Sequence, residues 1–386
     1  MKLFKSLLVA PAALGLMSPL AVSASETNLN DISAYSDVDT IEFANSFNKD
    51  ESNTNQLIAG GEGLVSGSSH DGGFSETTTA SFSADMYIGA VDGGTSDTDD
   101  AVMGTYSFQI DLNTSFTGED SLDISLDAGS GPEGVAEFDG NSGGDTLTVD
   151  GVSYTFPLGD KTTIIAGIDT DGSALFTTAC AYGGPGNMLD DCANVNAGIT
   201  GGGATVGAAY DFGSGFTAAF GAQTTESAVF TEESSDAFAL NAAYTADSYG
   251  FSVTYGSVES AASTETVTKA DQYTAFNAYY LPEGNLPSLS VGYEVGHLGA
   301  VGSASDEVTS FMVGLSWDEV GPGSAGLALG HSGTTEGTDE LYQYEAYYSY
   351  PINDGMSITP LIFTKDASGS GVDDTTGVMV KTSFSF

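Results

Sequence analysis

The stretch VMGTYSFQIDLNTSF, residues 102–116, alternates apolar and polar side chains along its whole length. The even positions, from Val102 to Phe116, are mostly apolar or aromatic, whereas the odd positions are polar apart from Met103. Alternation of this kind places one set of side chains on each face of a β-strand. A strand this long either lines the core of a β-sandwich or separates lipid from water.

The same alternation recurs through the chain and predicts about sixteen strands, an even number as in bacterial outer-membrane barrels. The expected strands cover roughly residues 78–90, 102–116, 122–128, 147–156, 161–168, 204–210, 216–222, 236–246, 249–257, 271–281, 289–295, 307–317, 323–331, 342–350, 356–364 and 377–386.

The gaps between these strands favour one architecture. Short gaps such as TGED, PLGD and PINDG carry turn residues, and longer gaps fall between them through the whole chain. An up-and-down barrel with short periplasmic turns and longer external loops has this rhythm, whereas a Greek-key sandwich does not. The fold class expected is therefore all-β, a transmembrane antiparallel barrel of about sixteen strands.

The first residues, MKLFKSLLVAPAALGLMSPLAVSASE, have the layout of a secretory signal peptide. Lysines precede an apolar run, and the small residues Val22 and Ala24 precede an expected cleavage site. We expect three parts: a signal peptide at 1–24, a flexible acidic periplasmic lead-in at 25–76, and the barrel at 77–386.

The charge balance limits the classes of partner that the chain can bind. The chain has 53 acidic residues against 7 Lys+Arg, all seven of them lysines. Nucleic acid is excluded as a partner because binding phosphates requires a basic face. The acidic excess suits a hydrated surface or a field that attracts cations.

Several segments together resemble the cyanobacterial outer-membrane porins related to the carbohydrate-selective porin family. The likeness is carried by MKLFKSLLVAPAALGL, by DLNTSFTGEDSLDISLDAG at 111–129, by YTFPLGDKTT at 154–163, by YEAYYSYPINDGMSITPLIF at 344–363 and by DDTTGVMVKTSFSF at 373–386. These motifs specify strands and turns, so they bear on the fold more than on the solute. Members of that family usually carry an N-terminal surface-layer homology module, which residues 25–73 leave no room for.

The resemblance implies a passive pore in the cell outer membrane, in contact with outer-membrane lipid. It also implies that the terminal aromatic residue, Phe386, is read by the barrel-insertion machinery. The expected solutes are small hydrophilic molecules and ions, either sugars or inorganic cations. Oligomeric state is left open, a homo-oligomer included.

If the apolar positions face lipid, the opposite positions face the lumen. This parity points seven charged residues inward, and Lys381 is the only basic residue that it places there. The expected pore-lining residues are Asp85, Asp111, Asp123, Asp127, Glu294, Glu345 and Lys381. A lining of this kind favours cations over anions. The alternative is that most of these carboxylates lie at the mouths and hydrate the rim.

Cys180 and Cys192 fall in the longest gap, residues 169–203. In an exported protein we expect them to form a disulfide. In sixteen-stranded porins the third external loop commonly folds into the lumen, which makes Asp190 and Asp191 candidates for a constriction. A stapled external cap is the alternative.

The sequence offers little for catalysis or for metal binding. GHSGT around His331 lacks the second glycine of a G-x-S-x-G motif, and DTDG at 169–172 does not complete a calcium loop. We therefore expect no catalytic residue, cofactor or metal site. Two other functions compete with a porin: a structural barrel with a plugged lumen, which large inward side chains would favour, and a surface hydrolase using His297 or His331. The inward positions are largely Gly, Ser, Thr and Ala, which favours an open pore.

Overall fold

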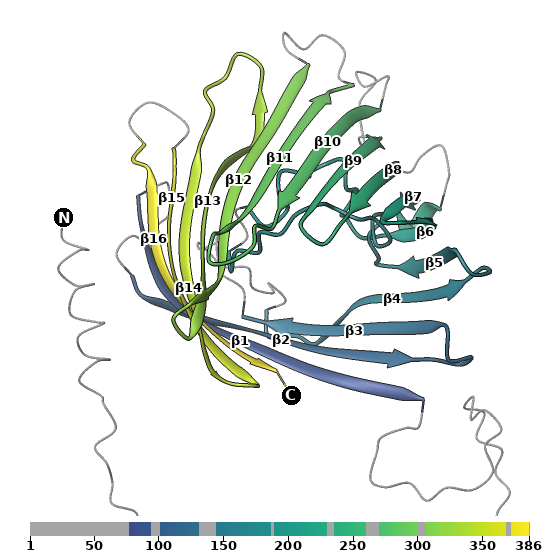
Figure 1. Ribbon diagram of the computed structural model, residues 1–386, viewed down its shortest axis with the longest axis horizontal. Coiled ribbons are helices and arrows are strands. Elements are labelled where there is room, and N and C mark those ends of the chain that lie inside the picture. Colours follow the sequence, from purple (N-terminus) through teal and green to yellow (C-terminus); the bar gives the residue numbers. More distant parts are fainter. Residues whose placement is uncertain are drawn as a thin grey trace, which may run out of the picture. The chain divides into compact units, whose positions relative to one another are not determined.

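The computed structural model describes residues 77–93, 101–130, 144–186, 189–229, 235–259, 270–299, 306–367 and 372–385. The expected signal peptide, the lead-in at 25–76 and Phe386 lie outside these residues. Within them the chain forms a closed barrel of sixteen antiparallel strands (Figure 1). The expected fold class is thus confirmed.

Each strand pairs with its neighbours in sequence, and the first strand pairs with the last. The strands are β1 (Thr78–Asp92), β2 (Met103–Thr114), β3 (Ser121–Gly129), β4 (Thr148–Pro157), β5 (Thr162–Ile168), β6 (Ala204–Gly213), β7 (Phe216–Thr224), β8 (Asp236–Thr245), β9 (Tyr249–Val258), β10 (Asp271–Tyr280), β11 (Ser288–His297), β12 (Glu307–Val320), β13 (Gly323–Thr335), β14 (Gln343–Asn353), β15 (Met356–Lys365) and β16 (Thr375–Ser385). A short 3₁₀ helix, η2 (Glu226–Ala228), follows β7.

No described helix is long and apolar enough to cross a membrane.

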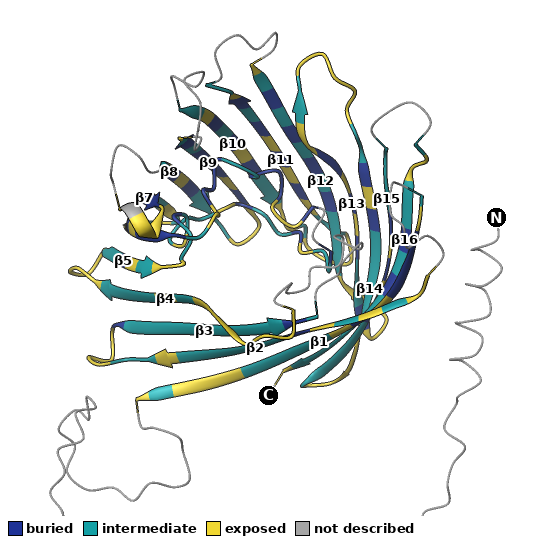
Figure 2. Ribbon diagram, turned by 180° about the vertical axis from the view of Figure 1, so that it is seen from behind, coloured by how far each residue is buried: buried dark blue, intermediate teal, exposed yellow. Residues whose placement is uncertain are grey.

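The register separates an outer face from an inner face. Along β1, Met86 and Ile88 are exposed whereas Tyr87 between them is buried. Strands β8 to β11 repeat this alternation of exposed and buried residues, visible as bands in Figure 2. The exposed set is apolar or aromatic on strand after strand, Phe220, Leu240 and Phe251 among them. This is the pattern of a barrel whose outside contacts lipid.

The turns at one end of the barrel are short. The turn between β2 and β3 is organised by Asp120, which accepts hydrogen bonds from the backbone N–H groups of Phe116 and Thr117. The hydroxyls of Ser115 and Tyr154 also donate to this carboxylate, over 2.9 and 2.6 Å. Aromatic rings pack together at this end, Phe116 with Tyr154 and Phe216 with Tyr244, as expected for an interfacial girdle.

Candidate pore

Four aspartates lie on consecutive rows of the inner wall. Asp85 on β1 shares a row with Ser107, and Asp127 on β3 lies in the next row, opposite Gln109. Asp111 on β2 and then Asp123 on β3 occupy the two rows after that. We name these four residues the carboxylate ladder. It runs from the middle of the wall towards the short turns, one carboxylate for each row.

Most of the ladder is hydrogen-bonded by uncharged groups. Asp111 accepts from the Gln109 amide and from the Ser125 hydroxyl, both over 2.8 Å. Asp123 accepts from Asn113 and Ser121, and Asp127 accepts from Thr148. Within the described residues only Asp85 is paired with a cation. The negative charge of the other three is therefore oriented by the wall but not neutralised.

The cation that pairs with Asp85 is Lys381 on β16. Its Nζ lies 3.4 Å from Asp85 Oδ2 and 5.4 Å from the centroid of the Tyr87 ring. The expectation that Lys381 alone brings positive charge to the inner face is wrong. Lys365, the last residue of β15, pairs in register with the buried Gln343 of β14 and so shares the inward parity.

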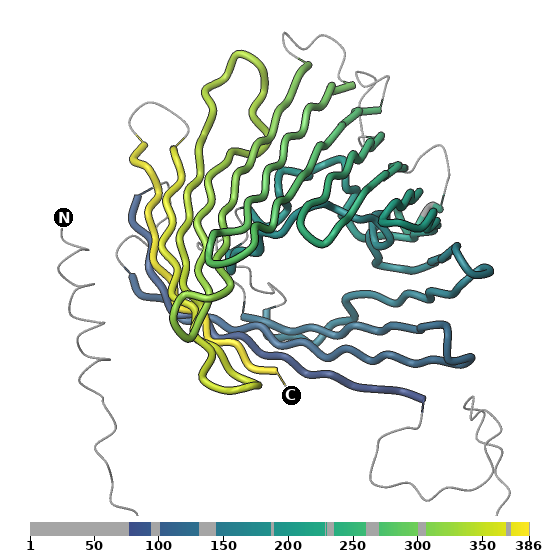
Figure 3. Tube along the Cα trace, viewed as in Figure 1, coloured from purple at the N-terminus to yellow at the C-terminus, as the bar shows by residue number. Residues whose placement is uncertain are grey.

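The long segment that follows β5, described at residues 169–186 and 189–203, lies in those residues along the inner wall from β6 to β14. Its backbone N–H groups donate to inward side chains of successive strands: Gly172 to Gln223, Thr177 to Asn241, Ala179 to Ser252, and Ala181 to Ser290. Figure 3 shows this teal segment passing inside the green strands. We name it the inner loop. Of the two alternatives left open by the sequence, the geometry corresponds to a loop within the barrel.

Glycines on the inner wall leave room for the inner loop. A Cβ added to Gly221 on β7 or to Gly292 on β11 would collide with loop carbonyl oxygens, those of Gly172 and Cys192. Gly256 on β9 similarly faces the Ala197 backbone. The loop backbone therefore lies directly against the sheet at these glycines, closer than any side chain would allow.

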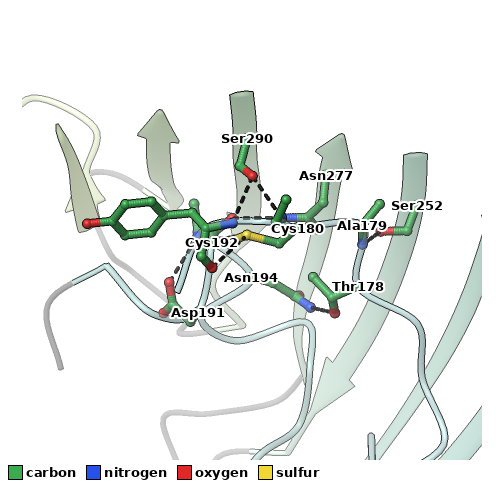
Figure 4. The surroundings of a disulfide bond; sticks show 12 residues. Thr178, Ala179, Cys180, Asp191, Cys192, Asn194, Ser252, Asn277 and Ser290 are labelled. Carbon is green, nitrogen blue, oxygen red and sulfur yellow. Dashed lines mark hydrogen bonds between the residues drawn. A yellow bond between two sulfur atoms is a disulfide. The ribbon is translucent and has the colours of Figure 1, made fainter. Parts of the chain in front are cut away.

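Cys180 and Cys192 form a disulfide within the inner loop (Figure 4). Both arms around it are fixed to the wall. Ala179 beside Cys180 donates to Ser252, and the carbonyl of Cys192 accepts from Asn277 over 2.7 Å. The disulfide thus closes a lobe, whose described residues are 181–186 and 189–191, and the two ends of the lobe are anchored on β9 and β10.

Glu294 and Glu345 face inward as expected, but they do not line an open surface. The inner loop covers both side chains, which are 1% and 4% exposed. Glu294 accepts hydrogen bonds from the loop residues Asn196 and Ala197. The Tyr182 hydroxyl donates to Glu345. Their place among the pore-lining residues is therefore corrected: both hold the loop.

The inner wall also carries a cluster of large apolar side chains, contrary to the expectation of a lining of small residues. Tyr87, Leu361, Phe363 and Met379 belong to β1, β15 and β16, and they form one buried cluster with residues of the inner loop and of β12. The loop contributes Tyr182, Leu189, Cys192 and Ala193. Part of the barrel interior is therefore packed, and any passage is narrower than the barrel.

Asp190 and Asp191 lie in the lobe and reach solvent at its surface, although loop atoms crowd the Asp191 carboxyl group on its other sides. Desolvation by the surrounding loop raises the pKa of Asp191 to about 6, and the charges of Asp190 and Glu294 add to this rise. A hydrogen bond from the Ala193 N–H acts in the opposite direction. Asp191 therefore loses its charge at a higher pH than an ordinary aspartate does.

The histidines do not form a described catalytic arrangement. His331 lies on β13 at the same parity as the outward-facing residues of that strand. Its ring lies near the rings of Phe311 and Tyr342, and it shares a hydrogen bond with Thr334. His297 ends β11, two strands away. In the described part of the chain, no group of three metal-ligating side chains is close enough to hold an ion.

The sequence reasoning missed three functional features: the anchoring role of Glu294 and Glu345, the apolar cluster, and the glycine path beneath the loop. A signal existed for the last of these. Gly221, Gly256 and Gly292 all fall on the inward parity, at positions where a strand gains nothing from glycine unless another backbone approaches it.

The chain matches no known family model, and no curated protein sequence matches it. Its fold matches solved porin structures. Pseudomonas putida OprB superposes with a TM-score of 0.60 at 10% identity, covering 80% of this chain and 94% of that chain. Salmonella typhi OmpF gives 0.59 at 12% identity, covering 80% and 97%. The Acinetobacter baumannii outer membrane channel DcaP gives 0.55 at 13% identity, covering 80% and 97%. The fold is that of bacterial outer-membrane porins and channels, and the apolar outer face agrees with the same location.

Proposed function

We propose that this chain is an outer-membrane porin that lets small hydrophilic solutes and ions diffuse passively, with a preference for cations. The shared barrel fold supports the general class. The observation that carries the cation preference is the carboxylate ladder, three of whose four members face no described cation. No catalytic step is involved.

The pore would run between the ladder and the inner loop. The ladder occupies β1 to β3, and the loop is fixed to β6 to β14 on the other side of the closed sheet. Asp190 and Asp191 add negative charge from the loop side. Aligned carboxylates along a narrow aqueous path lower the energy of a cation and raise that of an anion.

Two classes of solute are proposed, sugars and inorganic cations. The sequence motifs that resemble the cyanobacterial, carbohydrate-selective porins favour sugars, whereas the acidic lining favours inorganic cations. Both classes are small and hydrophilic, and a water-filled pore admits both. Selectivity among them would come from pore width and lining charge rather than from a specific binding site.

The deciding experiment is planar-bilayer recording from the purified protein under a KCl gradient. The expected result is stepwise conductance with a reversal potential shifted towards the equilibrium potential of potassium. A protein that inserts but never conducts refutes the porin and favours a structural barrel, with the apolar cluster as its plug. A preference for chloride refutes the role of the ladder in cation selectivity but does not contradict the barrel fold. Liposome swelling with neutral sugars then tests the second solute class.

A further inference from the structure

Glu345 is a buried carboxylic acid with an incomplete set of partners. In the sheet it lies between Ala328 of β13 and Phe363 of β15, and the loop residues Tyr182 and Gly184 cover it. The Tyr182 hydroxyl donates to Oε1. The second oxygen, Oε2, is inaccessible to solvent, and no described residue donates to it. An ionised carboxylate in such a place lacks both water and a compensating donor.

Glu294 on β11 is the contrasting case in the same barrel. It is equally buried, but the inner loop satisfies both of its oxygens. The N–H groups of Asn196 and Ala197 donate to Oε2 over 2.9 and 2.7 Å, and the Asn196 amide donates to Oε1 over 2.8 Å. Donors of this kind stabilise a carboxylate anion. The two glutamates therefore differ in their partners, since only Glu345 keeps a buried oxygen without a donor among the described residues.

The charged and titratable groups around Glu345 offer it no cation. From the loop it faces Tyr182 and, at longer range, the repelling carboxylate of Asp190. Its own strand adds Tyr347, whose hydroxyl donates to the Gly183 carbonyl. The flanking residues of β13 and β15 are apolar. Lys365, at the end of β15, makes no described ion pair with Glu345.

Building on the porin function proposed above, we infer that Glu345 is a positioning residue that carries a proton when the lobe is seated on the wall. Loss of that proton leaves a buried charge facing apolar side chains and Asp190. The Tyr182–Gly184 segment then lifts away so that water reaches the carboxylate. Ser252 and Asn277 anchor the two ends of the lobe, and Ser290 holds the N–H groups of Ala181 and Tyr182, so the described lobe residues turn about these anchors into the lumen.

The expected consequence is closure of the pore as the pH rises. The neutral form of Glu345 holds the lobe on the wall. The lobe is therefore fully seated at low pH, and it leaves the wall when Glu345 loses its proton. A one-proton transition changes the ratio of closed to open time by up to about tenfold for each pH unit. Titration of Asp191 changes selectivity in acid and is a separate effect.

The test is single-channel recording from about pH 5 to about pH 9, the range in which buried glutamates titrate. Wild type should show closures that increase with pH. Glu345→Gln, which keeps the shape without the titration, should give a flat profile. Asp247→Asn, in the short turn between β8 and β9, should retain the wild-type dependence. A pH-dependent Glu345→Gln profile, or a flat wild-type profile, overturns the inference.

A second readout does not depend on conduction. Infrared difference spectra of the folded protein should contain the band of a protonated carboxyl group at neutral pH that is missing from Glu345→Gln. Absence of that difference refutes the inference even if the pore conducts. Conversely, if the band is present but the protein does not conduct, the protonation of Glu345 is supported and the porin function is refuted instead. Circular dichroism melting establishes that the variants are folded.

Discussion

Asparagine in place of Asp111 should weaken cation selectivity without disturbing the wall. The side-chain oxygen of asparagine can still accept from Gln109 or Ser125, each of which donates to Asp111 over 2.8 Å. Only the charge is removed. Asp111 is one of the two interior residues of the ladder, with Asp127 and Asp123 in the rows on either side, so its loss leaves a gap within the ladder.

The magnitude follows from Coulomb's law. An ion passing about 7 Å from one carboxylate in water gains or loses about 0.6 kcal/mol. At about 0.1 M salt, screening over a Debye length of about 10 Å halves this energy. The local cation concentration then changes by a factor of about 1.7, and chloride changes by the inverse factor. The permeability ratio should therefore fall by about threefold for each carboxylate removed.

Reversal potentials under a KCl gradient measure this ratio. Asp111→Asn should lower it by about threefold, and replacement of all four ladder aspartates should lower it by at least about tenfold. The matched control is Asp247→Asn, in the short turn between β8 and β9 and away from the ladder, which should change the ratio less. An unchanged ratio in the fourfold variant would refute the ladder as the source of selectivity.

Three further predictions follow from the loop and the turns. Gly292→Val should displace the inner loop, because the new side chain collides with the Cys192 carbonyl, and should change the unitary conductance. Asp120→Asn should lower the melting temperature at neutral pH. The Tyr154 hydrogen bond above all holds the pKa of Asp120 well below its usual range, so the difference from wild type should shrink as the pH falls below about 4. Asp191→Asn should remove the loss of cation selectivity expected on acidification through a pH of about 6, as measured by reversal potentials.

The first two of these have a control within the chain. Gly104→Ala introduces a side chain where there is space, since its Cβ would lie 3.8 Å from the nearest neighbour, and should leave conductance unchanged. Tyr154→Phe should weaken the pH dependence of the difference in melting temperature that Asp120→Asn causes. Selectivity that still falls on acidification in Asp191→Asn would assign the titration to another group.

The strands and their two faces were predictable because alternation reports directly on the pleat of a sheet. The stretch 102–116 predicted β2 and its inward Asp111, and the register agrees. Lys365 was missed because the expected strand ended one residue earlier. Alternation does not show whether another part of the chain covers a given face of the sheet. Glu294 and Asp111 have the same inward parity, yet one lies beneath the inner loop, and a contact between positions 196 and 294 leaves no local trace in the sequence.

The ion pair of Lys381 with Asp85 has a consequence for assembly. It spans the seam between β16 and β1, where the sheet closes on itself in a register that places Lys381 opposite Tyr87. A slip of one residue at this seam would turn Lys381 towards lipid, and a slip of two would move its ammonium group away from Asp85. Most of the other seam pairs join small or apolar side chains, which tolerate such shifts more readily. The ion pair of Lys381 therefore favours the observed register at the closure of the sheet over registers shifted by one or two residues.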